Sequence, residues 1–155
     1  MRTLTTLLAG VGLFALAACN PNRDAGAGDS EGHHHEPPHG GTAVVLGDEE
    51  YHLEFVLDAA AGRMQVYVLS AHMEGFVRIS AESLGVIVKL PNREEVLAFK
   101  PVANTATGET VGDTSMFETQ ADWLKANKTF DAVLKEITIK GKTYENVEFN
   151  FPKGN

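Results

Sequence analysis

The sequence predicts an all-β fold, an antiparallel Ig-like β-sandwich of about 7–8 strands with one short helix. From residue 42 onward, short runs of β-branched and aromatic residues are separated by turn residues about every 8–12 positions, a spacing typical of sandwiches and barrels. The chain has 155 residues, of which 43% are hydrophobic and 22% charged, so it suits a soluble fold with a single core.

The expected strands lie between residues that favour turns. They are residues Thr42–Leu46, Tyr51–Leu57, Met64–His72, Phe76–Ile79, Gly85–Leu90, Val96–Val102, Phe130–Ile139 and Tyr144–Phe151. Tight turns are expected at Gly47-Asp48, Ala61-Gly62, Pro91-Asn92 and Lys140-Gly141. The short helix is expected over Ala121–Asn127, and a long exposed loop over Asn104–Ser115.

Alternation along a strand assigns side chains to opposite faces of the sheet. In the second expected strand, the apolar set that we assign to the core is Tyr51, Leu53, Phe55 and Leu57. The intervening His52 and Glu54 are therefore expected to face solvent. In the last strand, the same reasoning turns Val147, Phe149 and Phe151 inward.

The first residues read as an export signal. Met1 and Arg2 form a short positive region, and the apolar run Leu4–Ala18 is shorter than the roughly 20 residues of a membrane-spanning helix. The run ends in Leu16-Ala17-Ala18-Cys19, which resembles a bacterial lipobox and implies cleavage before Cys19 and lipidation of its sulfur, with fatty acids such as palmitate in the lipid anchor. The alternative is a free or buried thiol after an ordinary signal peptide.

These features divide the chain into three parts. Residues 1–18 are the expected lipoprotein signal peptide, residues 19–41 a lipidated, His-rich disordered tether, and residues 42–155 the β-sandwich domain. The tether lacks large apolar residues and cannot bury enough surface to offset chain ordering. Asn20 rather than Asp follows Cys19, so the lipobox resemblance implies an outer-membrane anchor facing the periplasm.

Charge, cysteine content and missing motifs exclude several classes of function. Thirteen basic and 21 acidic residues give a net charge of −8, which argues against nucleic acid and anionic lipid surfaces as main partners and favours cations. A single cysteine excludes an intrachain disulfide and a Cys-rich zinc site. The sequence also lacks a His-Glu-x-x-His motif, a phosphate loop and a nucleophile elbow, so we expect a binding protein rather than an enzyme.

The tether carries four of the six histidines, at His33, His34, His35 and His39. Neutral imidazole binds zinc, copper and nickel, and short His-rich tracts are a metal-binding composition. Glu36 adds a carboxylate to the same stretch. The alternative is a solvated spacer that binds metal only incidentally.

A second set of candidate ligands lies within the domain. His39, His52 and His72 would form a metal site if the first three strands brought them together. The thioethers of Met64, Met73 and Met116 suggest copper(I), with His72 and Met73 adjacent in the sequence. Strand histidines at the surface and methionines in the core are the ordinary alternative.

Several segments carry a resemblance to known proteins. They are His39-Gly40-Gly41, Leu46-Gly47-Asp48, Tyr51-His52-Leu53-Glu54, Val56-Leu57-Asp58, Gly62, Tyr67-Val68-Leu69 and Ile139–Tyr144. Residues 39–72 and 130–151 thereby resemble small, uncharacterised bacterial envelope lipoproteins with an N-terminal His-Gly-Gly segment. The opening segment is more distantly similar to the N-terminal β domain of periplasmic adaptor proteins of heavy-metal efflux pumps, which implies metal handling in the periplasm.

Two functional hypotheses follow. The first is a lipoprotein, anchored to the membrane through Cys19, that binds zinc, copper or nickel ions through His33, His34, His35, His39, His52 and His72. It would buffer these ions or deliver them to an envelope metal-efflux complex. The second is a non-catalytic structural or interaction lipoprotein in which the histidines are only a spacer.

Overall fold

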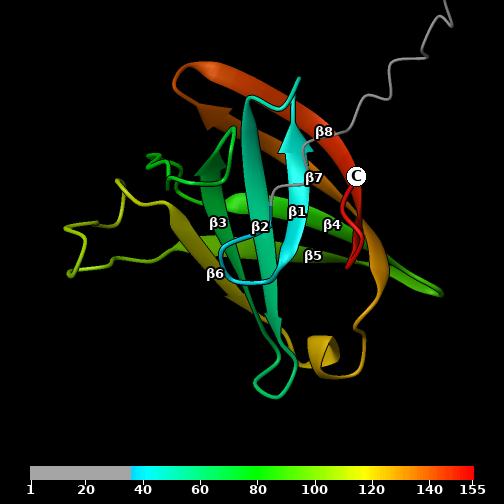
Figure 1. The fold of residues 1–155 in the computed structure, drawn as a ribbon. Helices are drawn as coiled ribbons and strands as arrows, with labels where there is room; N and C mark the ends of the chain where they lie inside the picture. Colours follow the sequence, from blue (N-terminus) through cyan, green and yellow to red (C-terminus); the bar gives the residue numbers. More distant parts are fainter. Residues whose placement is uncertain (1–35) are drawn as a thin grey trace, which may run out of the picture. The chain divides into compact units, whose positions relative to one another are not determined.

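The computed structural model describes residues 36–155 and confirms the predicted all-β antiparallel fold. Eight strands form one sheet in the order β1-β2-β3-β6-β5-β4-β7-β8 (Figure 1). Within residues 36–155, no helix is long and apolar enough to cross a membrane. Cys19, His33, His34 and His35 lie outside the described residues.

The strands follow the predicted turns closely. Their bounds are β1 Thr42–Leu46, β2 Tyr51–Asp58, β3 Arg63–Ser70, β4 Leu84–Leu90, β5 Arg93–Pro101, β6 Met116–Gln120, β7 Phe130–Ile139 and β8 Lys142–Phe151. The expected helix is a single 3-10 turn, η1, at Asp122–Lys125.

The sheet consists of two four-stranded halves that face each other across the core. Strands β1, β2, β3 and β6 form one half, and β5, β4, β7 and β8 form the other. Only the short pairing of Lys100 with Glu118 and Pro101 with Phe117 links β5 to β6. Strands β1 and β8 also contact each other, so the sheet nearly closes on itself (Figure 1).

Aromatic packing joins the two halves. The ring of Phe55 in β2 stacks on Phe149 in β8 at 4.7 Å and meets Phe99 in β5 edge-on at 5.8 Å. Phe55 is 1% exposed and Leu53 is fully buried, as their alternation predicts. Tyr51 and Leu57, assigned to the same face, are only half-buried.

The expectation that His52 and Glu54 face solvent is wrong. Both side chains point away from the core, yet their residues are only 3% and 0% exposed. The strap, which we define as residues 36–41, covers Glu54 on this outer face of β2, as described below. Strand alternation gives the direction of a side chain but does not show what later covers it.

Two predicted boundaries also differ. Phe76–Ile79 is not a strand, because its residues make only isolated pairs, Leu69 with Phe76 and Ile79 with Thr114. Conversely, β6 was not predicted, since Met116–Gln120 has one fully buried apolar residue, Phe117, and looks like a polar connection.

The outer edge of β1 is covered by the segment that follows β8. The backbone N–H of Val45 donates to Asn155 Oδ1 at 2.8 Å, and Asn155 Nδ2 donates to the Val45 carbonyl at 3.2 Å. A Cβ at Gly154 would collide with the carbonyl oxygen of Ala43. One side-chain amide therefore supplies the donor and acceptor that a neighbouring strand would otherwise offer.

Candidate functional site on the outer face of β2

The structure separates the predicted ligands of the domain. His39 belongs to the strap, His52 to β2, and His72 to an exposed turn after β3. Across residues 36–155, no three His, Cys, Asp or Glu side chains come close enough to hold a metal ion. The three histidines of the domain therefore do not form a shared site.

Glu54 binds the strap to β2. One of its oxygens, Oε1, accepts hydrogen bonds from the backbone N–H groups of His39 at 2.8 Å and Gly41 at 2.9 Å. The other, Oε2, lies 2.8 Å from Nδ1 of the His39 ring. Gly40 between them has a φ of 67°, which a glycine adopts without strain. A fully buried carboxylate thus fixes the base of the segment that we predicted to be a tether.

Gly41 is required for this close approach. A Cβ at position 41 would lie 2.6 Å from the carbonyl oxygen of Phe55 and 2.8 Å from Cγ of Glu54. Any side chain larger than hydrogen would push the strap away from β2. The His-Gly-Gly segment therefore has a direct structural role: its two N–H groups and its ring all meet one carboxylate.

Two aromatic residues pack against the ring of His39. It stacks on Tyr67 of β3 at 3.9 Å with an interplanar angle of 15°, and Phe76 lies 5.8 Å away. Burial, followed by the negative charge of Glu54, raises the pKa of Tyr67 above its usual value. Tyr67 therefore stays a neutral phenol against the ring, while the His39 side chain keeps 35% of its surface exposed.

The contact with Glu54 determines which ring nitrogen of His39 carries the proton. An ionised carboxylate only accepts hydrogen bonds, so Nδ1 must donate. In the neutral ring, Nε2 then bears a lone pair. Metal-bound histidines in proteins commonly have this arrangement, in which a carboxylate orients the ring and makes the free nitrogen more basic.

His52 lies in a different place on the same face. It lines a hollow of about 380 Å³ together with Pro37 of the strap, Val45 of β1, Glu49 and Met73. Lys153 and Asn155 also line it. His52 therefore shares this hollow with residues of the strap and with the thioether of Met73, and no second histidine lines it.

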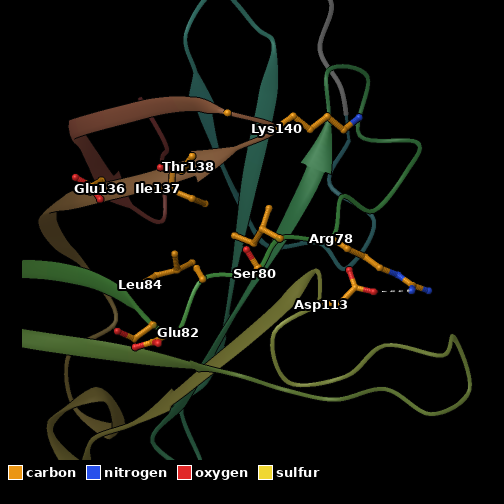
Figure 2. A pocket seen from close by; sticks show the side chains of 13 residues that line it. Arg78, Ser80, Glu82, Leu84, Asp113, Glu136, Ile137, Thr138 and Lys140 are labelled. Carbon is orange, nitrogen blue, oxygen red and sulfur yellow. Dashed lines mark hydrogen bonds and ion pairs between the residues drawn. The ribbon is translucent and has the colours of Figure 1, made fainter.

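Another hollow, of about 640 Å³, lies between the segment 78–84 and the end of β7 (Figure 2). Its Arg78 is bound to Asp113 at 3.2 Å and lies 3.6 Å from the buried Glu109, so it fastens the loop before β6. Figure 2 shows Glu82 and Glu136 directed away from this pair. None of the predicted ligands lines this hollow, and its exposed charges of both signs suit a solvated surface.

Sequence reasoning missed the partnership of His39 and Glu54. A signal for it was present, because a tight turn at Gly47-Asp48 pairs β1 with β2 and places Ala43 opposite Glu54. The strap must then pass close to Glu54. The stacking of Tyr67 and Phe76 on His39 depends on the β2–β3 register and on a turn that carries no such signal.

Comparisons of this chain with protein-family models, with curated proteins and with solved structures found no match.

Proposed function

We propose that this protein is a lipid-anchored, periplasm-facing lipoprotein that binds transition-metal ions of the zinc, copper and nickel class. Capture takes place at His33, His34 and His35, with His39 as the fixed ligand at the base of the tract. The observation that carries the proposal is the bond between His39 Nδ1 and the fully buried Glu54.

A flexible His-rich tract alone binds metal weakly, because binding must also order the chain. Here the last histidine of the tract is already ordered: two backbone bonds and one ring bond hold it to Glu54. A ligand fixed before binding lowers the entropic cost of closing the site. His39 therefore gives the tract a preorganised end and exposes Nε2 as the ligating atom.

The cellular role follows from the anchor and the resemblance. Lipidation of Cys19 would hold the protein at the outer membrane, and the net charge of −8 favours cations as binding partners. The similarity of the opening segment to adaptor domains of heavy-metal efflux systems supports buffering or delivery of the ion to such a complex. No catalytic step is part of the proposal.

Calorimetric titration with zinc, copper(II) and nickel tests the proposal on the chain from residue 19 with Cys19→Ser. Three variants accompany it: the triple change of His33, His34 and His35 to Ala, the change Glu54→Gln, and Glu148→Gln. Glu148 is the matched control, because its carboxylate is 78% exposed and its ion pair with Lys89, at 3.9 Å, is long. Truncation before Thr42 is avoided, since it would leave Glu54 without the strap.

We expect the triple change to abolish binding and Glu54→Gln to weaken it about 10-fold to 100-fold, the usual effect of losing an outer carboxylate. Glu148→Gln should have no effect. Binding should also fail below about pH 6, where imidazoles protonate. A chain that binds none of the three metals better than about 0.1 mM would refute metal binding and leave the structural or interaction lipoprotein.

A further inference from the structure

We propose that two copies of this chain associate by pairing their β5 strands, antiparallel and edge to edge, about a two-fold axis at Val96. The surface is the β5 edge, which we define as the side of residues 93–99 that faces away from β4. The inference goes beyond the proposed function and does not depend on metal binding.

The β5 edge has no strand beside it. Strand β4 pairs with β5 along residues 93–99, whereas β6 reaches only Lys100 and Pro101 on the other side. The two strands then diverge, because β6 runs to η1 while β5 extends to its hairpin with β4 (Figure 1). Across residues 36–155, no other segment pairs with this side of residues 93–99. Such an edge offers backbone N–H and C=O groups to a further strand.

The hairpin turn determines which backbone groups face the β5 edge. Leu90 and Arg93 pair across a loop of two residues, so they are a hydrogen-bonded pair. From Arg93 onward, alternate residues of β5 therefore bond to β4. The residues between them direct both backbone groups to the free edge; these are Glu94, Val96 and Ala98. The N–H of Val102, which continues this alternation, donates to the Met116 carbonyl of β6 at 2.9 Å, as expected.

These free groups are symmetric about Val96. If the valines of two copies lie opposite each other, Glu94 of each chain lies opposite Ala98 of the other. Each such pair exchanges two bonds, so the three pairs satisfy every free group on both edges.

The length of the edge selects the same register. With the valines opposite each other, the second strand reaches its hairpin turn just where β6 begins to pair with Lys100. A shift by two residues in one direction would place Glu94 of the second copy on the position that β6 occupies. A shift in the other direction would leave Ala98 opposite the turn. The edge therefore fits a second copy of itself without steric conflict with β6.

Val96 and the charges beside it favour this partner. Val96 is 69% exposed, and the pairing brings the two valines together and removes apolar surface from water. Glu94 then lies diagonal to Lys100 of the second copy, at a Cβ separation of about 7–8 Å that two long side chains can span. Glu118, opposite Lys100 in β6, already accepts from Gln65 at 2.9 Å and lies 3.8 Å from Arg63. Two pairs of unlike charge thus form across the axis.

Sedimentation velocity tests the pairing on the chain from residue 19 with Cys19→Ser. A chelator is present throughout, so that the histidines cannot join two chains through a metal. The interface is small, so we expect a reversible dimer with a dissociation constant on the order of 100 μM. Val96→Lys places like charges opposite each other and should weaken the dimer about tenfold. Val111→Lys is the matched control, because this valine is 70% exposed and lies outside β5, and it should have no effect.

A charge exchange tests the register and guards against misfolded variants. Glu94→Lys and Lys100→Glu should each weaken the dimer about tenfold, because each places like charges on both diagonals. An equimolar mixture of the two variants has unlike charges on both diagonals and should recover the association. Variants that had lost their fold would not recover on mixing. A mixture that associates no better than its components would overturn the register.

Hydrogen exchange identifies the occupant of the edge. The amides of Glu94, Val96 and Ala98 should gain protection between about 10 μM and 1 mM protein, whereas the intervening amides, bonded to β4, should be protected throughout. Equal protection of all these amides at both concentrations would mean that the same chain covers its own edge. That result, or a chain that stays monomeric at about 1 mM, would refute the pairing and leave the proposed metal binding untouched.

Discussion

Replacing Glu54 by Gln should release the strap from β2. The carboxylate is fully buried and accepts three hydrogen bonds, two from backbone N–H groups of His39 and Gly41 and one from the His39 ring. Glutamine has nearly the same shape but no charge, and its amide nitrogen is a donor. The substitution therefore alters hydrogen bonding and electrostatics with little change in packing.

The expected cost follows from these bonds. Hydrogen bonds to a charged group contribute about 1.5–3 kcal/mol each, roughly twice the value of neutral ones. Over the three bonds that Glu54 accepts, the difference amounts to about 2–4 kcal/mol. The loss of global stability has an upper limit, because once the strap detaches, water satisfies its N–H groups and further weakening costs nothing.

Two measurements separate local from global effects. Urea unfolding followed by the fluorescence of Trp123, which packs edge-on against Phe130 at 5.8 Å, reports the whole domain. Hydrogen exchange at the amides of His39 and Gly41 reports the strap. We expect exchange at both amides to accelerate at least 30-fold, against no change in Glu148→Gln. Unchanged exchange in Glu54→Gln would refute the role assigned to this carboxylate.

Three further changes test the fold. Burial, reinforced by the hydrogen bond to Glu50, raises the pKa of Tyr144 from 10.0 to about 12; its contribution to stability is therefore complete below pH 10 and lost as the pH rises toward 12. Urea unfolding across this range should show the decline in the native chain but not in Tyr144→Phe, and identical profiles would contradict it. Asn155→Ala removes two bonds to Val45 and should cost about 1–2 kcal/mol in the same assay, against no cost for the exposed Asn92→Ala. Phe55→Ala should cost about 3–5 kcal/mol and lower the melting temperature in calorimetry; a loss under 1 kcal/mol would show that its ring does not join the two halves.

Much of the fold was predictable because short-range patterns determine it. Gly47-Asp48 and Lys140-Gly141 mark real hairpin turns, and the alternation of Leu53 and Phe55 with polar residues gives the core face of β2 correctly. Strand β6 was missed because its pairing with β3 and β5 is decided by contacts distant in sequence. Its own residues carry little periodicity, so only the assembled sheet shows that Phe117 belongs to the core.

The candidate site was predictable in its residue types but not in its groupings. Sequence reasoning named His39 and Met73 as candidate ligands, but it assigned Glu54, the partner of His39, to solvent and paired Met73 with His72. Both groupings depend on which segments lie over the outer face of the sheet. The strap lacks any periodic signal, and Met73 reaches the hollow through a left-handed turn. Sequence alternation describes a bare sheet and does not indicate which segment lies over its outer face.

The contacts of His39 also link metal binding to retention of the strap. If Nε2 binds a metal while Nδ1 donates to Glu54, each interaction must strengthen the other by the same factor, because coupling free energies are reciprocal. A 10-fold to 100-fold loss of affinity in Glu54→Gln corresponds to about 1.4–2.7 kcal/mol. Saturating metal should then slow exchange at the Gly41 amide by a comparable factor in the native chain and not in the variant. Tight binding that leaves this amide unchanged would mean that the tract holds the metal without His39, because a metal on His39 cannot be indifferent to the carboxylate behind its ring.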